Sequence, residues 1–238
     1  MTTKNKPFFK YTLLTIGCLF TLSLISAWMT PAQAGINFKP PVTSAPSRSS
    51  AGGSRGESCA IGKSNKNNVS IVKLLPKSNI GLTEEQRPSI MVYVPATTAR
   101  TAFFSIQDEN YNHHYQTTLQ LPEQPGVIEI KLPSEAPALE TGKNYQYSLV
   151  MICGVDMEPD DPLTSGWIQR VKPKGNLNQK ASVELASRLA SDGIWFDAVS
   201  TLAELRKSQP SNQSVVDSWQ ELLESADLSE IAQEPIVN

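Results

Sequence analysis

Apolar and polar positions alternate along the middle of the chain in short runs that are separated by turn residues. In residues 127–132, for example, Ile128, Ile130 and Leu132 alternate with a glutamate and a lysine, which is the pattern of a strand with one buried face. Seven β-rich runs occur, at residues 69–75, 88–94, 102–107, 113–121, 127–132, 145–153 and 166–171. Their number and spacing predict an antiparallel Ig-like β-sandwich of about seven strands over residues 59–173.

After Pro173 the apolar positions recur with the period of a helix. Three stripes are present: Val183, Ala186, Leu189 and Ala190; Phe196, Val199, Leu202 and Leu205; and Val215, Val216, Trp219, Leu222 and Leu223. Gly193 is expected to end the first helix, Pro210 the second, which would run over 195–208, and the third would follow Asn212. We expect the stripes to pack on each other or on the sandwich. The fold class is therefore α+β, with a helical region over residues 174–238.

The first 34 residues have the order of a secretory signal. Three lysines precede an apolar stretch over residues 11–29, and Ala32-Gln33-Ala34 offers a small-residue cleavage site, so we expect cleavage between Ala34 and Gly35. If the segment is not cleaved, the same stretch is long enough to anchor the chain in a membrane. Export to the periplasm, the cell envelope or the extracellular space is the prediction, with membrane contact only through an uncleaved signal.

Residues 35–58 are rich in proline, serine and glycine, and contain few large apolar side chains after Phe38 and Val42. Such a composition favours an extended, flexible tether. The whole chain has a formal charge of −2, and loss of the three signal lysines would make it three units more negative. A mildly acidic protein without a basic stripe is poorly suited to phosphate backbones, so we expect no nucleic-acid partner.

Two of the three cysteines, Cys59 and Cys153, lie outside the signal. An even pair in an exported protein most simply forms one disulfide, although two buried free thiols would be compatible with the same sequence. A disulfide would join the start of the sandwich region to its far end.

Two resemblances add to these predictions. The pattern Gly193-x-Trp195-Phe196-x-Ala198 is similar to the turn and second helix of a tetratricopeptide repeat, which implies a TPR-like helical hairpin. The chain also resembles a cyanobacterial family of exported proteins known as domain of unknown function 928. The matching pieces are Gly52–Gly56, Arg87-Pro88, Val92–Pro95, Phe104–Asp108, Leu139–Tyr145, Cys153, Gly166–Val171 and Gly193–Ala198. The resemblance implies export and makes Cys59 and Cys153 family positions, but it implies no activity.

No group of residues has the spacing of a known catalytic or cofactor site. His113 and His114 are adjacent on a predicted strand, so their side chains should point to opposite faces and not share a metal. The acidic run of Asp156, Glu158, Asp160 and Asp161 departs from the EF-hand order, and a solvated loop is expected there. We therefore predict no cofactor and no metal.

Trp167 and Arg170 are the candidate interface residues, because both types are enriched in binding hot spots. A tryptophan that fills the core is the competing interpretation, and Gly166 beside it indicates a bulge or a close backbone approach.

These observations predict a non-enzymatic module that binds a protein of the cell envelope. The alternatives are a carbohydrate-binding protein, or a hydrolase of polysaccharide or peptidoglycan that would use carboxylates among Asp108, Glu109, Asp156 and Asp160.

Overall fold

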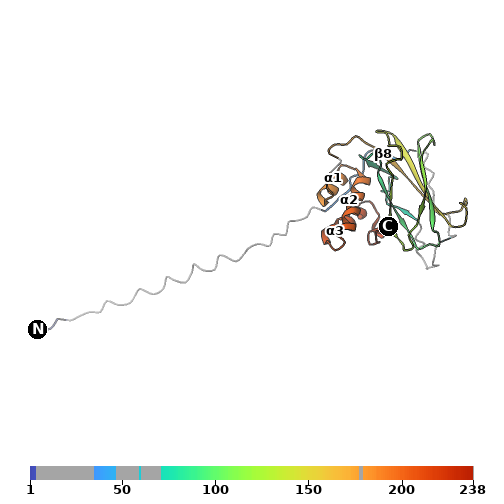
Figure 1. Cartoon of the computed structure of the whole chain (residues 1–238). Helices are drawn as coiled ribbons and strands as arrows, with labels where there is room; N and C mark the ends of the chain where they lie inside the picture. The colour runs from blue at the N-terminus through green and yellow to red at the C-terminus, as the bar shows by residue number, and fades with distance from the viewer. Residues whose placement is uncertain (4–34, 47–58, 60–70, 177–178, 238) are drawn as a thin grey trace. The chain divides into compact units, whose positions relative to one another are not determined.

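The computed structural model describes residues 1–3, 35–46, 59, 71–176 and 179–237 (Figure 1). The chain divides into two units between Ala34 and Gly35, and the second unit contains every strand and helix reported below. Residues 4–34 of the predicted signal and residues 47–58 of the predicted tether lie outside the described residues. Within the described part of the chain, no helix has the length and apolar character needed to cross a membrane.

The strands form two sheets. The first has the order β1-β3-β6 and the second the order β2-β8-β7-β4-β5. Their bounds are β1 Val72–Lys73, β2 Ile80–Thr83, β3 Ser89–Val94, β4 Thr101–Asp108, β5 His113–Gln120, β6 Gly126–Lys131, β7 Asn144–Ile152 and β8 Leu163–Arg170. The seven predicted runs each contain one of these strands in whole or in large part, because period-two alternation is a local signal.

β2 is a strand that the sequence pattern did not predict, and it corrects the expectation of a purely antiparallel architecture. It pairs in parallel with β8, from Ile80 opposite Trp167 to Thr83 opposite Arg170. It is four residues long and follows Asn79, which has a positive φ of 58°. All four of its residues are buried, so β2 has no alternation of buried and exposed positions that the pattern could have revealed.

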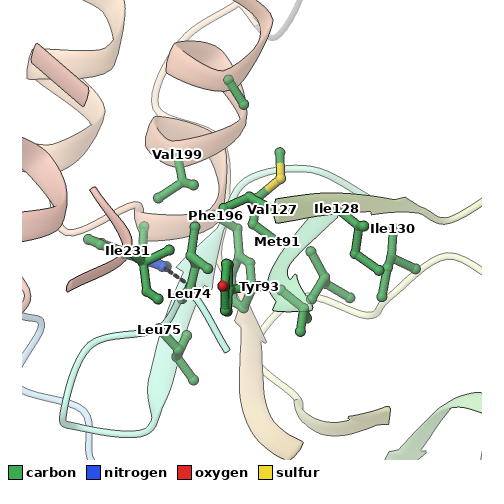
Figure 2. Packing of buried hydrophobic residues seen from close by; sticks show 14 of the residues in the cluster. Leu74, Leu75, Met91, Tyr93, Val127, Ile128, Ile130, Phe196, Val199 and Ile231 are labelled. Carbon is green, nitrogen blue, oxygen red and sulfur yellow. Dashed lines mark hydrogen bonds between the residues drawn. The ribbon is translucent and has the colours of Figure 1, made fainter. Parts of the chain in front are cut away.

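Side chains from both sheets and from the helices belong to one buried apolar cluster (Figure 2). In β7, the side chains of Tyr145, Tyr147, Leu149 and Met151 are buried and alternate with half-buried ones, as expected for a strand with one face on the core. β3 is buried on both faces over residues 90–94. The sheet that contains β3 therefore lies inside the molecule, with other parts of the chain on either side.

The three predicted helices are confirmed. α1 spans Val183–Ser191, α2 Trp195–Ser208 and α3 Gln213–Ser225, and a short 3-10 helix follows at Ser229–Ile231. The side chain of Ser182 accepts a hydrogen bond from Leu185 N and caps α1, and Asn212 caps α3 in the same way through Ser214 N. Gly193, with a φ of 78°, makes the turn between α1 and α2.

α2 is the helix that attaches the helical region to the sheets. The indole N–H of Trp195 donates to the carbonyl of Leu74 at 2.9 Å, just after β1. The ring of Phe196 fills the space above Gly81 in β2, where a Cβ atom would come within 2.7 Å of it. Both contacts require close approach of backbone and aromatic rings, so they fix the position of α2 on the strands.

The stretch over residues 35–46 corrects part of the expected tether. Ile36 and Phe38 are buried, at 3% and 4% exposure, and alternate with exposed residues. Phe38 packs edge-to-face on Trp195, with the ring centroids 4.8 Å apart. Composition pointed to a tether because the segment is mostly polar, but two apolar side chains at alternate positions are sufficient to dock a short stretch on a helical surface.

The predicted disulfide is present. It joins Cys59 to Cys153, whose Cα atoms lie 5.3 Å apart. The carbonyl of Cys59 also accepts hydrogen bonds from Thr98 N and from the hydroxyl of Thr97, both at 2.9 Å. Cys59 is thereby held to the loop before β4 as well as to the end of β7.

Candidate functional site

A cleft of about 590 Å³ lies between the sheet that contains β3 and β6 and the helices α1 and α2. Its walls come from the residues that follow β2, from the charged face of β6, from the stretch before α1 and from both helices. Because these pieces are far apart in sequence, the cleft exists only in the folded chain.

The lining of the cleft is charged and of mixed sign. Its acidic residues are Glu84, Glu85, Glu129, Asp197 and Glu204, and its basic residues are Arg87, Lys131, Arg188 and Lys207. Leu185 and Leu189 of α1 add an apolar portion. A cleft of this kind can pair with both charges of a polypeptide and cover part of an apolar side chain.

Asp197, in the first turn of α2, is a buried acid of the cleft, as is Glu84. It accepts hydrogen bonds from the hydroxyl of Thr83 at 2.5 Å and from Glu84 N at 2.8 Å, and so joins α2 to the end of β2. Burial raises the pKa of Asp197 to about 7, although the hydrogen bonds from Thr83 and Glu84 oppose the shift. Glu84 and Glu85 nearby add to the increase. The carboxyl group therefore changes its charge near neutral pH.

Glu129 forms the opposite side of the cleft, on β6. Its carboxylate accepts a hydrogen bond from Lys207 of α2 at 2.8 Å and lies 3.4 Å from Lys131. Burial alone would raise the pKa of Glu129, but the hydrogen bonds from Lys207 and Ser89 and the two lysine charges outweigh it and lower the pKa. Glu129 and Lys207 thus form an ion pair across the cleft.

The two candidate interface residues lie apart from the lining of the cleft. Trp167 is 3% exposed, and it points away from the core cluster, because its neighbours Gly166 and Ile168 face that cluster. A Cβ atom on Gly166 would lie 2.6 Å from Leu75 Cδ2, so the predicted close approach is confirmed. Arg170 is half-buried and donates to the carbonyl of Leu139 at 2.8 Å. An interface role for Trp167 and Arg170 stays a prediction.

The histidines and the acidic run have local structural contacts. His113 is exposed, whereas His114 packs on the ring of Tyr145 and contacts the carbonyl oxygen of Pro137 at 3.1 Å. Asp161 accepts hydrogen bonds from the backbone of Cys153 and of Glu158 and so orders the loop after β7. Among the described residues, no group of three or more histidine, cysteine or acidic side chains is placed to hold a metal ion.

The carboxylates that a hydrolase was expected to use are not brought together. Asp108 lies opposite Tyr145 at the start of β7, with Glu109 beside it, whereas Asp156 and Asp160 follow the end of the same strand. A nine-residue strand separates the two pairs by about 30 Å. Hydrogen bonds from the side chain and backbone of Asn112 lower the pKa of Asp108, as suits a carboxylate that orders an exposed turn.

The residues that line the cleft were not singled out by the sequence. Thr83 and Asp197 are 114 positions apart, and Glu129 and Lys207 are 78 apart, so no spacing connects them. One local signal existed for Asp197, because an acid in the first turn of a helix is stabilised by the helix dipole.

Comparison with known proteins identifies a family. No curated protein matches the chain. The model of the family described as Domain of Unknown Function (DUF928) matches residues 50–236, a range that includes both sheets, the three helices, the disulfide and every residue of the cleft. The chain therefore belongs to the DUF928 family, as its resemblance to that family implied.

Proposed function

We propose that the protein is an exported protein of the cell envelope that acts without chemical turnover, by binding a partner protein in the cleft between the sheet and α1–α2. The observation that carries this proposal is the cleft itself. It is a hollow of about 590 Å³ whose lining carries charges of both signs, which a protein partner could complement.

Two features support export. The peptide bond at which the second unit begins, between Ala34 and Gly35, is also the expected signal cleavage site. The Cys59–Cys153 disulfide is consistent with an oxidising compartment. A protein released at this bond would keep the whole of the second unit.

The proposal of binding without turnover is supported by the way the acids of the cleft are used. Asp197 holds α2 to β2, and Glu129 is paired with Lys207. Both carboxyl groups thus have structural partners. Arg188 and Glu204, by contrast, are exposed at the cleft, and the one side-chain bond of Arg188 among the described residues, to Gln179 Oε1 at 3.5 Å, is long enough to give way to a partner.

The test is cross-linking of the tagged full-length protein in its native envelope, followed by identification of the proteins that copurify. We expect one partner that is lost in Glu204→Lys and in Arg188→Glu. It should be retained in Glu230→Lys, which makes the same change at an exposed position outside the cleft. Equal recovery with all variants would show that the cleft is not the binding site.

A hydrolase of polysaccharide or peptidoglycan is the second candidate, and one observation favours it. Asp197 is a carboxyl group with a pKa of about 7 in a cleft that contains four further acids, which is an environment suited to a general acid. Release of soluble fragments from purified peptidoglycan or envelope polysaccharide, lost in Asp197→Asn, would favour turnover over binding. Recovery of glycan alone in the cross-linking experiment would favour a carbohydrate-binding protein.

We also infer a finer description of the architecture. Two sheets that share one apolar cluster are compatible with an Ig-like sandwich, apart from the parallel β2–β8 pair. α1 and α2, joined at Gly193, are compatible with a TPR-like hairpin. A cyanobacterial origin stays a prediction from the family resemblance.

A further inference from the structure

The backbone at Gly35 lies against a carboxylate of α3. Ile36 N donates to Glu221 Oε2 at 2.9 Å, and a Cβ atom built on Gly35 would lie 3.2 Å from the same oxygen and 3.3 Å from Oε1. The nitrogen of Gly35 is one covalent bond from the Cα that would carry this Cβ. Glu221 is therefore within reach of the Gly35 nitrogen.

The carboxylate of Glu221 is available for an ion pair. Among the described residues, no lysine or arginine forms an ion pair with Glu221, since all of their ion pairs involve other acids. α3 contains no basic residue, and its acids Asp217, Glu221 and Glu224 lie along one stripe at helical spacing. A positive charge placed beside this stripe would be stabilised.

The segment that follows Gly35 is fixed by regular contacts. Phe38 N donates to Ser225 Oγ at 3.1 Å, and Lys39 N donates to the carbonyl of Ala190 at 3.1 Å. Burial of Ile36 and Phe38 holds these bonds in place. The first residue of the second unit is thus positioned by the four residues after it.

We propose that Glu221 is the binding site for the amino terminus created when the signal is removed. Hydrolysis of the Ala34–Gly35 bond consumes one water, leaves a carboxylate on Ala34 and a positively charged α-ammonium on Gly35, and so places a cation beside Glu221. In the uncleaved chain the same nitrogen is an uncharged amide and can offer only a neutral hydrogen bond. This inference rests on the export and cleavage proposed above, and it adds that cleavage itself strengthens the docking of residues 35–39.

The experiment begins with the full-length chain expressed in an export-competent bacterial host. The exported product is purified, and its N-terminus is read by mass spectrometry. Its α-amine is then converted to a carbonyl by selective transamination with pyridoxal phosphate, which removes the charge and leaves the rest of the chain unchanged. Amide hydrogen exchange at Phe38 reports how firmly the segment is docked.

We expect transamination to accelerate exchange at Phe38 by about two- to fivefold, the effect of one partly exposed ion pair. Glu221→Gln should give a similar acceleration, and transamination of that variant should add little, because the two changes remove the same interaction. Glu224→Gln removes an equal charge from the same stripe, and its exchange should still respond to transamination.

The outcomes separate the two proposals. A product that retains residues 1–34, or that begins elsewhere, would overturn both the proposed cleavage and the ion pair. A product that begins at Gly35 but whose exchange at Phe38 is unchanged by transamination would leave the cleavage intact and overturn the role of Glu221.

Discussion

The carboxyl group of Asp197 has two roles in the structure. It lines the cleft, and it accepts the hydrogen bonds that join α2 to β2. Because burial raises its pKa to about 7, protonation of this single group affects the fold at pH values where most acids are already charged.

The stability of the protein should therefore depend on pH through Asp197. Between the unfolded pKa near 3.8 and the folded pKa near 7, the folded state binds the proton more strongly, so the free energy of unfolding should fall as pH rises through this interval and level off above it. The contribution is at most about 4 kcal/mol. Urea unfolding from pH 4.5 to 8 measures it. Asp197→Asn cannot titrate and should lose this slope; an unchanged slope would assign it to another group.

A second prediction at the scale of single residues concerns Gly166. Its Cα faces Leu75 Cδ2 and the hydroxyl of Tyr147, which would lie 2.6 and 2.7 Å from a Cβ atom. Gly166→Ala should lower the free energy of unfolding by about 1–3 kcal/mol, because the core has no room for the methyl group. Gly154→Ala is the control, since its nearest neighbour would be 3.8 Å away, and its stability should stay within about 0.5 kcal/mol of the original. Equal denaturation midpoints for the two variants would contradict the close approach.

At the scale of elements, α2 connects the two sides of the cleft through Lys207 and Glu129. Lys207→Ala should lower the free energy of unfolding by about 1 kcal/mol, because it leaves the half-buried Glu129 carboxylate with the hydrogen bond from Ser89 and the exposed Lys131 but without its closest cation. Lys143→Ala breaks the exposed pair with Glu140 and should have little effect in the same denaturation experiment. If the two lysine variants were equally stable, the pair across the cleft would contribute no more than a surface pair.

The elements differ in how far the sequence predicts them. α2 could be predicted closely because its signals are local: a glycine turn before it, an apolar stripe along it and Pro210 after it. β2 could not, because its partner is β8, at the other end of the strand region. The cleft shares this limitation, since its hydrogen bonds join β2 to α2 and β6 to α2 over long separations.

At the scale of the whole molecule, the disulfide closes a loop with a sequence separation of 94. Cys59→Ser with Cys153→Ser should lower the free energy of unfolding by up to about 4–5 kcal/mol, the chain-entropy value for a loop of this length. Treatment of the original protein with a reductant should reproduce the loss seen in thermal or urea unfolding. A double variant as stable as the oxidised protein would mean that the unfolded chain gains little freedom from its removal.

The bonds of Ile36 and Phe38 to α3 also limit the order in which the contacts of the folded protein can form. The bonds from Ile36 to Glu221 and from Phe38 to Ser225 span 185 and 187 positions. During synthesis from the amino terminus, this segment emerges long before the helix that it contacts, and it must wait for almost the entire chain. Contacts that close such long loops slow the final step of folding. In an exported protein, these two bonds could form only after α3 itself had crossed the membrane.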